Sequence, residues 1–356
     1  MNTMNLTINP LPAFTYRWLH MNEAHVADAR AEESLRLDQE IPASVTELPP
    51  DPSFREIPTG AGPELDRLLQ AANVRPLHFL AGPCSEKLPE VLRLNYVCGS
   101  GNAGAACALQ LTLPEESRLI AVMDLTSSED AEGFAALQTR IRAGKNARLD
   151  LVQLIRPGKR VVLINDIGAD CGEGAELCVH HLFLGGREVY AGCLAELHGD
   201  DSSLTVRAGY DLDGDRKLDM NYIANQTGRR TKSDMEAAGV LRDRAFKLFR
   251  GTIDFKKGCA GSTGDEMEDV LMMDDTVVNQ TIPLILCAEE DVAGNHGATI
   301  GRPEESALFY AQSRGMSEEA VYEMLARAKI DRIIHQIPDA KTRHNLYVAL
   351  KEEEPQ

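Results

Sequence analysis

The middle of the chain, from Leu77 to about Asn295, consists of short apolar runs, many of them alternating with polar residues and separated by Gly, Asp and Asn. This period of two is typical of β-strands that turn one face toward a core. Within the region one spacing recurs: Gly or Pro, then Ser or Ala three positions later, Leu five positions later and an apolar residue seven positions later. Its four instances are Pro114/Ser117/Leu119/Ala121, Gly144/Ala147/Leu149/Leu151, Gly172/Ala175/Leu177/Val179 and Gly199/Ser202/Leu204/Val206.

The starts of these instances differ by 30, 28 and 27 residues. A repeat of this length predicts a parallel β-solenoid, in which a turn residue leads into a strand and each coil stacks on the one before. A fifth instance, Gly228/Thr231/Ser233/Met235, follows after 29 residues but loses the apolar character, and we find no sixth. Chance is the alternative explanation, because Gly, Ala and Leu are common. Helices that would alternate with strands in a βαβ fold are missing from the pattern, which argues against that competitor.

Helical patterns flank this region. The first 75 residues are rich in Pro and Glu, and we expect one helix after Pro12 and another after Pro63, with a linker between them. Near the other end, Gly315 suits a left-handed stop after one helix, and Ser317 can cap the next. The sequence thus predicts a mainly β protein in three parts: an N-terminal helical region with a linker at 1–75, a β-helix core at 76–300 and a C-terminal helical module at 301–356.

Charge and cysteine usage narrow the possible partners. The 37 basic and 55 acidic residues give a net charge of −18, which repels phosphate backbones and anionic lipid heads, so neither nucleic acid nor a membrane is the expected partner. The opening MNTMNLTINP lacks the cationic and apolar segments of a secretory signal, so we expect a cytoplasmic protein. The eight cysteines form no CxxC pair, and we expect most of them to be reduced and buried.

Several familiar motifs are absent or incomplete. Gly144-Lys145 and Gly158-Lys159 lack the upstream glycine and the following hydroxyl residue of a P-loop, so the chain is not itself a P-loop ATPase. In the acidic stretch 210–215 the glycine is the fourth residue counted from Asp211, whereas a calcium loop needs it at the sixth position, and an acidic turn is the better interpretation. His180 and His181 adjoin on an expected strand, so only one of them should face inward.

The segment from Cys287 to Gly301 carries more chemistry than the rest of the chain. It places a thiol, three carboxylates and the imidazole of His296 at the junction between the strands and the C-terminal helices. Thiolate and imidazole are soft and borderline metal ligands, so Cys287 and His296 are the candidate metal ligands of the chain. On chemistry alone a structural role is favoured, with a buried cysteine and a hydrogen-bonded histidine beside a tight glycine turn.

This segment also carries a resemblance to a known family. EEDVAGNHGATIG (289–301) followed by LFYAQSRGMSEEA (308–320) resembles the C-terminal signature of the SufB/SufD family of iron-sulfur cluster assembly proteins. The HGAT form is closer to SufD than to SufB, whose stretch usually reads HEAT. FRGTIDF (249–255) resembles the family's F-x-G-x-I block, and LPAFTYRWLHMNEA (11–24) its first helix with Pro and Trp. The likeness spans most of the chain and is strongest from about 160 to 340.

The resemblance implies a right-handed parallel β-helix flanked by helical regions, which agrees with the repeat. It implies a noncatalytic scaffold that works with a SufC-type ABC ATPase and with a SufB-type subunit or a second copy of itself, in a dimer whose subunit contact builds a transient iron-sulfur cluster. His296 occupies the position of the histidine associated with that contact. Cys287 cannot be carried over from the family pattern, and it is equally a candidate ligand and a candidate buried structural thiol.

The resemblance further implies that the ATPase docks on the C-terminal helices, and one of the two aromatic residues there is expected to pack inside the helical module. Two other functions stay open. One is a β-solenoid enzyme acting on polysaccharide, although such enzymes are commonly exported and use aromatic platforms, whereas this chain has one Trp. The other is a structural dimer with a vestigial site. The residues expected to bind the ATPase are Leu308, Phe309, Tyr310, Arg314 and Gly315.

Overall fold

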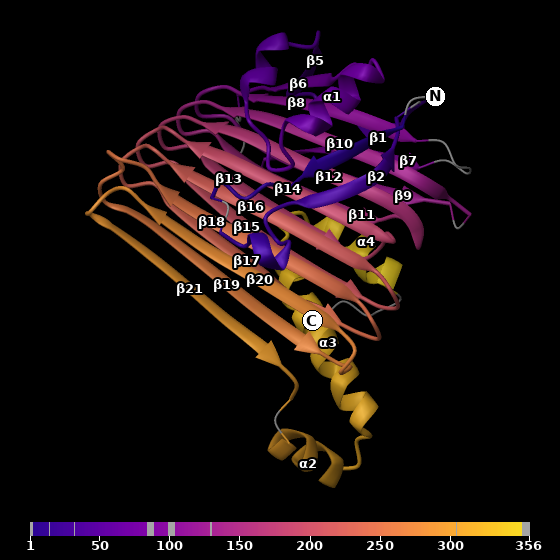
Figure 1. The fold of residues 1–356 in the computed structure, drawn as a ribbon. Helices are drawn as coiled ribbons and strands as arrows, with labels where there is room; N and C mark the ends of the chain where they lie inside the picture. The colour runs from indigo at the N-terminus through magenta and orange to yellow at the C-terminus, as the bar shows by residue number, and fades with distance from the viewer. Residues whose placement is uncertain are drawn as a thin grey trace.

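A computed structural model of the chain confirms a mainly β fold built on a parallel β-solenoid (Figure 1). The structure describes residues 3–13, 15–31, 33–83, 89–98, 104–128, 130–303 and 305–350. Successive strands alternate between two facing sheets, so each coil contributes one strand to each sheet. We call them the even sheet and the odd sheet after the numbers of their strands.

The strands of both sheets run parallel along the solenoid. The even sheet contains β6 (Leu77–Ala81), β8 (Ala105–Leu113), β10 (Glu132–Ala143), β12 (Arg160–Cys171), β14 (Glu188–Leu197), β16 (Lys217–Gln226), β18 (Phe246–Phe255) and β20 (Val278–Cys287). The odd sheet contains β7 (Glu90–Cys98), β9 (Arg118–Ser127), β11 (Arg148–Arg156), β13 (Glu176–Phe183), β15 (Ser203–Leu212), β17 (Lys232–Leu241), β19 (Ser262–Met272) and β21 (Val292–Gly301).

The register of the odd sheet confirms the repeat found in the sequence. The residues at the seventh position after each turn are Cα partners along the sheet, and we call this row the inner ladder. The ladder continues beyond the fifth instance into two further coils, which sequence reasoning missed because their residues at this position are polar. Its members are Ala121, Leu151, Val179, Val206, Met235, Glu266 and His296.

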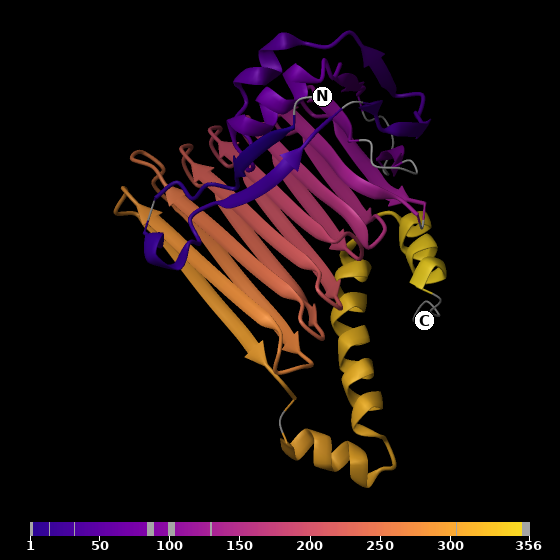
Figure 2. The ribbon, with the colours of Figure 1, turned by 45° about the vertical axis from the view of Figure 1, so that its right-hand side comes forward.

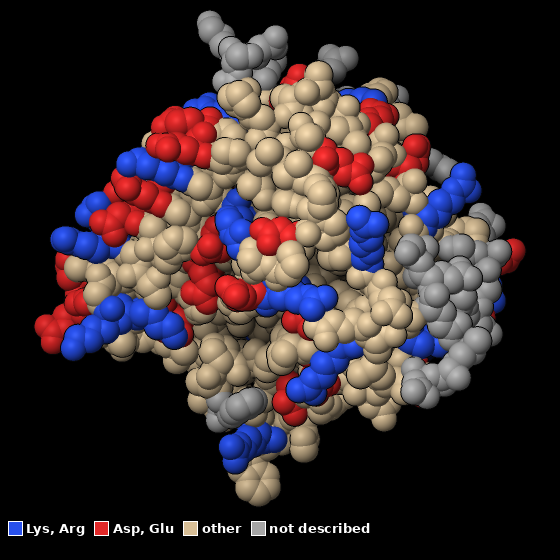
Figure 3. Space-filling view, turned by 90° about the horizontal axis from the view of Figure 1, so that it is seen from above, with Lys and Arg blue, Asp and Glu red and all other residues tan. Residues whose placement is uncertain are grey.

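The turns that precede the odd strands are held by charge pairs from coil to coil. Lys145 pairs with Glu173 at 3.0 Å, and Arg230 pairs with Asp201 at 2.6 Å. Figure 3 shows basic and acidic side chains alternating along this rim of the molecule. Because these pairs are exposed and water screens them, they add little to the stability of the stack, which depends mainly on the buried ladders.

The two ends of the solenoid differ. At the first end, the short antiparallel strands β4 (Arg36–Glu40) and β5 (Val45–Leu48) pair with β7 and β6, and β3 (Glu33–Ser34) lies beside β8. At the other end, β20 and β21 are the outermost strands of their sheets within the described part of the chain. Figure 1 shows this second end without the cover that the N-terminal segment gives the first.

The N-terminal region contains more strand than the sequence predicts. The hairpin of β1 (Met4–Ile8) and β2 (Ala24–Ala29) lies on the outer face of the even sheet, beside α1 (Pro63–Ala71). The helix expected after Pro63 is confirmed as α1, which starts at that proline. A second short element, the 3-10 helix η2 (Pro52–Glu56), precedes α1 and buries Phe54.

The helix expected after Pro12 is wrong. Residues 11–13 and 15–23 lie in a loop with one 3-10 turn, η1 (Arg17–Leu19), and Trp18 is exposed in that turn. Tertiary hydrogen bonds hold this loop, because the buried guanidinium of Arg250 donates to the carbonyl oxygens of Met21 at 2.7 Å and Glu23 at 3.1 Å. These contacts come from β18, more than two hundred residues away, so local periodicity could not reveal them.

Three helices follow the solenoid: α2 (Glu305–Ser313), α3 (Glu318–Gln336) and α4 (Ala340–Leu350). The predicted cap is confirmed, since the backbone N–H of Ala320 donates to the hydroxyl of Ser317 at 3.1 Å. α3 lies along the outer face of the odd sheet, where Ile333 and Ile334 are buried, while α2 projects away from both sheets (Figure 2). No helix within the described ranges is long and apolar enough to cross a membrane. The three-part division of the chain stays a prediction.

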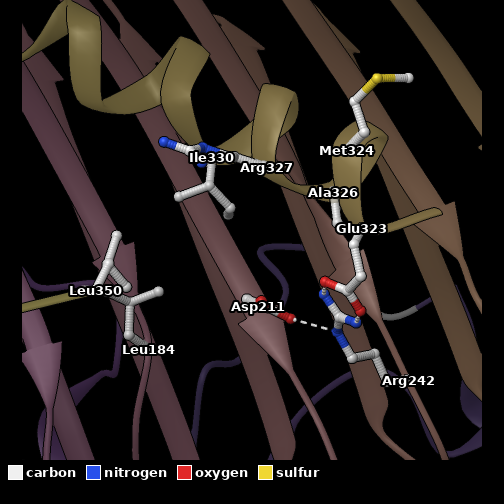
Figure 4. A pocket seen from close by; sticks show the side chains of 9 residues that line it. All are labelled: Leu184, Asp211, Arg242, Glu323, Met324, Ala326, Arg327, Ile330 and Leu350. Atoms are coloured by element: carbon white, nitrogen blue, oxygen red, sulfur yellow. Dashed lines mark hydrogen bonds and ion pairs between the residues drawn. The ribbon is translucent and has the colours of Figure 1, made fainter. Parts of the chain in front are cut away.

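A groove separates part of α3 from the odd sheet (Figure 4). Arg242 bridges it, with one ion pair to Asp211 at 3.1 Å and another to Glu323 of α3. Burial raises the pKa of Asp211, and Arg242 opposes this shift. On the same face, Lys329 of α3 pairs with Asp269 at 2.5 Å. The helix is therefore fixed to the sheet by charge as well as by its apolar face.

A polar network is buried in the middle of the solenoid. His181 faces inward and His180 outward, as predicted from their adjacent positions. The hydroxyl of Tyr222 donates to Nδ1 of His181 at 2.7 Å, and Nε2 donates to Oε1 of Gln153 at 2.7 Å. The same Oε1 accepts a hydrogen bond from Asn165 at 2.7 Å. Burial lowers the pKa of His181 to about 3, so the ring is neutral at ordinary pH.

This network predicts a pH-dependent loss of stability. Below the usual pKa of 6.5, His181 binds a proton in the unfolded chain, whereas in the folded chain it stays neutral down to about pH 3. Acidification therefore favours unfolding. Between pH 7 and pH 5 this residue should remove about 2 kcal/mol from the free energy of unfolding. Urea unfolding at several pH values should show that His181→Gln lacks this component, whereas His25→Gln, at an exposed site, keeps it. Parallel pH profiles for His181→Gln and the native chain would contradict the prediction.

Candidate functional site

The two candidate ligands of the sequence analysis both lie in the last coil. Cys287 is the final residue of β20 and the partner of Phe255, while His296 lies in the middle of β21 and is the partner of Glu266. Phe255 and Glu266 are buried inside the solenoid. Because partners in a parallel ladder share one face of their sheet, Cys287 and His296 face the interior from opposite sheets. They are exposed because β20 and β21 form the last coil in the described part of the chain.

Cys287 differs from the other described cysteines. Its thiol is exposed and donates to the carbonyl oxygen of Glu289 at 3.0 Å. Cys178 is half-buried and the remaining described cysteines are buried, as expected, while Cys84 lies outside the described residues. The alternative that Cys287 is a buried structural thiol is therefore wrong.

His296 does not act as a structural bridge within the described part of the chain, where the carboxylates near it form no hydrogen bond with its ring. Its neighbour Asn295 does form one, since it donates to Asp265 at 3.0 Å on the other face of the strand. No three His, Cys, Asp or Glu side chains among the described residues lie close enough to hold a metal ion together. The last coil thus presents individual ligands but not a complete metal site.

A charged layer lies directly beneath the last coil, and sequence reasoning missed it. Lys247 of β18 forms a fully buried ion pair with Glu268 of β19. The hydroxyl of Thr281 donates to Glu268 at 2.5 Å and accepts from Lys247 at 3.3 Å. Glu266 is also buried, and its Oε2 has no hydrogen-bond partner in the described part of the chain. The signal in the sequence was the run STGDEMED (262–269), which places both glutamates at alternate, inward positions.

The charged layer has an excess of negative groups. Burial raises the pKa of Glu266 to about 7, and Lys247 opposes this shift. Burial also lowers the pKa of Lys247 to about 7, and Glu266 opposes that shift. Two carboxylates therefore share one ammonium group in a space that excludes water, and such an arrangement is costly unless further positive charge or protons are supplied.

The residues expected to bind an ATPase lie on α2 and at its end. Phe309 is 74% exposed and Tyr310 is 62% exposed, so the expectation that one of them packs inside the helical module is wrong. The guanidinium of Arg314 lies 5.2 Å from the centre of the Tyr310 ring. Leu308 instead packs toward α3, and Gly315 ends the segment with a positive φ of 90°.

Comparison with known proteins points in one direction. A family model described as the SufBD core domain of the SUF system for FeS cluster assembly matches residues 96–329. The chain is 30% identical over 142 residues to an iron-sulfur cluster assembly SufBD family protein of Mycobacterium bovis, Mb1496, a match that covers 40% of this chain and 16% of that protein. It is 23% identical over 221 residues to the iron-sulfur cluster assembly protein SufD of Escherichia coli, covering 61% of this chain and 52% of that protein.

A third relative is the iron-sulfur cluster assembly protein SufB of Bacillus subtilis, 27% identical over 108 residues, which are 30% of this chain and 23% of that protein. The matched segments thus span at most about half the length of these relatives.

The exposure of Cys287 predicts selective chemical modification. Iodoacetamide should modify Cys287 first among the described cysteines, because its thiol alone among them is exposed. Cys171 and Cys193 should react only after unfolding, since both are buried and burial raises the pKa of the Cys171 thiol to about 12. Peptide mapping by mass spectrometry over time measures the order. Modification of Cys193 as fast as that of Cys287 would show that the coil interior is open to solvent.

Proposed function

Because the chain belongs to the SufBD family of the SUF system, whose core domain it matches over residues 96–329, we propose that it is a scaffold subunit on which an iron-sulfur cluster is assembled. The observation that carries this proposal is the last coil. There the inner ladder, apolar through Met235, ends in an exposed imidazole, and an exposed thiol stands at the end of the facing sheet. Both groups are iron ligands, and the cluster is cargo that the site holds and releases.

A second solenoid subunit completes the site. Both β20 and β21 present backbone N–H and C=O groups at the outer edges of their sheets within the described chain, and such edges favour pairing with another strand. The subunit is a SufB-type protein or a second copy of this chain, and the cluster forms at the contact between the two. The described residues of one chain bring no three ligands together, which supports a shared site in which the partner supplies the remaining groups.

The chain has no catalytic role of its own in this proposal. A cytoplasmic SufC-type ABC ATPase binds α2, and its ATP hydrolysis drives assembly. The exposed pair Phe309 and Tyr310, with Arg314 beside it, has the composition of an interface anchor. α2 follows His296 by nine residues, so the ATPase surface lies close to the cluster site along the chain.

The cluster proposal predicts a loss of cargo without a loss of fold. After anaerobic reconstitution of the complex with iron and sulfide, His296→Ala should hold less iron and acid-labile sulfide than the native chain. Its melting temperature should fall by no more than about 2 °C, because the side chain is exposed. His25→Ala, at another exposed site, is the matched control. Cys287→Ser is assayed in the same way, and retained cluster would remove that residue from the site.

A different result would favour a structural dimer with a vestigial site. That result is an unchanged cluster content per folded complex in His296→Ala, together with a large fall in melting temperature.

The docking proposal is best tested by point variants. α3 and α4 cover the apolar outer face of the odd sheet, so deleting residues 303–356 would expose buried residues and confuse docking with misfolding. Phe309→Ser with Tyr310→Ser should weaken capture of a purified SufC-type ATPase roughly tenfold or more, because exposed aromatic anchors dominate interfaces. Val348→Ser on α4, which is 62% exposed, is the control and should bind normally. Equal capture by both variants would place the ATPase elsewhere.

A further inference from the structure

The inner ladder changes character at one residue, Glu266. Its five earlier members, from Ala121 to Met235, are apolar, as the interior of a solenoid requires. Glu266 then occupies a position where every earlier coil buries a methyl, isopropyl, isobutyl or thioether group. Its side chain is 3% exposed, and its partner in the next coil is His296. A carboxylate at this position is not explained by packing.

The surroundings of Glu266 do not satisfy its carboxylate. It lies against Gly251 of the facing sheet, where an added Cβ would come within 2.4 Å of Glu266 Oε2. Oε2 of Glu266 is buried and has no hydrogen-bond partner among the described residues.

Lys247, the one buried ammonium group in this charged layer, is engaged elsewhere. It forms its ion pair with Glu268 and lies 3.3 Å from the hydroxyl of Thr281. Glu268 in turn accepts a hydrogen bond from Thr281. Of the two buried carboxylates, Glu266 is thus the one that Lys247 does not pair with. It lies one coil before the exposed His296, as its ladder partner.

We infer that Glu266 is a ligand for ferrous iron, which enters at the open end of the solenoid and is bound between the Glu266 carboxylate and the His296 imidazole. This inference rests on the proposed function, since it assigns a second residue to the same site. Partners on adjacent strands are about 4.8 Å apart and point the same way, so both side chains can reach one ion. An oxygen and a nitrogen ligand suit a divalent ion such as Fe²⁺, with water in the remaining positions.

The two ligands have different roles in holding the ion. The carboxylate of Glu266 lies where water does not screen charge, and a divalent cation bound to it neutralises the excess of negative groups in the charged layer. The exposed imidazole is the accessible group, which sulfide or a ligand from the partner subunit can replace. The site therefore holds iron as an ion before any sulfur reaches it. Cys287, on the other sheet, is not needed for this first step.

The test is an anaerobic titration of the purified full-length chain, without ATPase or partner, using Co²⁺ as a spectroscopic stand-in and then Fe²⁺. The native chain should bind one ion with visible Co²⁺ absorption bands, and Glu266→Gln should weaken this binding roughly tenfold or more. His296→Gln should weaken Co²⁺ binding similarly. Because both residues belong to one site, the effects of the two substitutions should not add in full in the double variant. Asp265→Asn, which removes the adjacent carboxylate on the outer face of the same strand, should bind like the native chain.

A second variant protects the test against misfolding. Glu266→Met extends the apolar inner ladder, so it should fold at least as well as the native chain and still lose the ion. Native-like Co²⁺ binding by Glu266→Gln or Glu266→Met would overturn the inference, as would a native chain that binds no more Co²⁺ than the double variant. If His296→Gln alone loses the ion, the role of Glu266 fails while the proposed function stands. The proposed function fails separately, if complexes carrying His296→Ala reconstitute a normal cluster.

Discussion

Each inward side chain of the solenoid packs between its counterparts in the preceding and the following coil. This register constraint organises the whole molecule, because the parallel ladders keep equivalent residues stacked and the interior excludes water. Its consequence is strongest where the stacking ends. His296 and Cys287 have counterparts on one side only within the described chain, so groups that would be buried in any earlier coil are exposed. The fold therefore presents a histidine and a cysteine at its open end without a dedicated loop.

The buried polar groups of the interior are of two kinds. The network around His181 is neutral, and both ring nitrogens and the amide oxygen of Gln153 have partners, although Oδ1 of Asn165 has none among the described residues. The layer near the open end is charged, and there the oxygen without a partner among the described residues belongs to the carboxylate of Glu266, next to the Lys247–Glu268 pair. Buried ion pairs rarely add stability in proportion to their Coulomb energy, so this layer is better explained by function than by folding.

The C-terminal helices connect this open end to the outer surface. α3 is bound to the odd sheet by apolar packing and by ion pairs such as Lys329–Asp269, and it stays attached along the solenoid. α2 projects away from the sheets in Figure 2, Leu308 packs toward α3, and its aromatic residues Phe309 and Tyr310 are exposed. Between β21 and α2, Arg302 pairs with Asp275 at 2.6 Å. A protein bound to α2 would thus act on a segment directly continuous with the strand that carries His296.

The sequence by itself determined the solenoid, because a period of two within a strand and a repeat of turn residues both follow from local chain geometry. It also placed Cys287 and His296 at the end of the strand region and showed that His180 and His181 face opposite sides. Tertiary structure alone decided that Glu266 and His296 are ladder partners, since the polar coils interrupt the apolar repeat that defined the register. It also decided that residues 11–13 and 15–23 form a loop held by the distant Arg250 and not a helix, because hydrogen bonds between remote segments leave no periodic signal in the sequence.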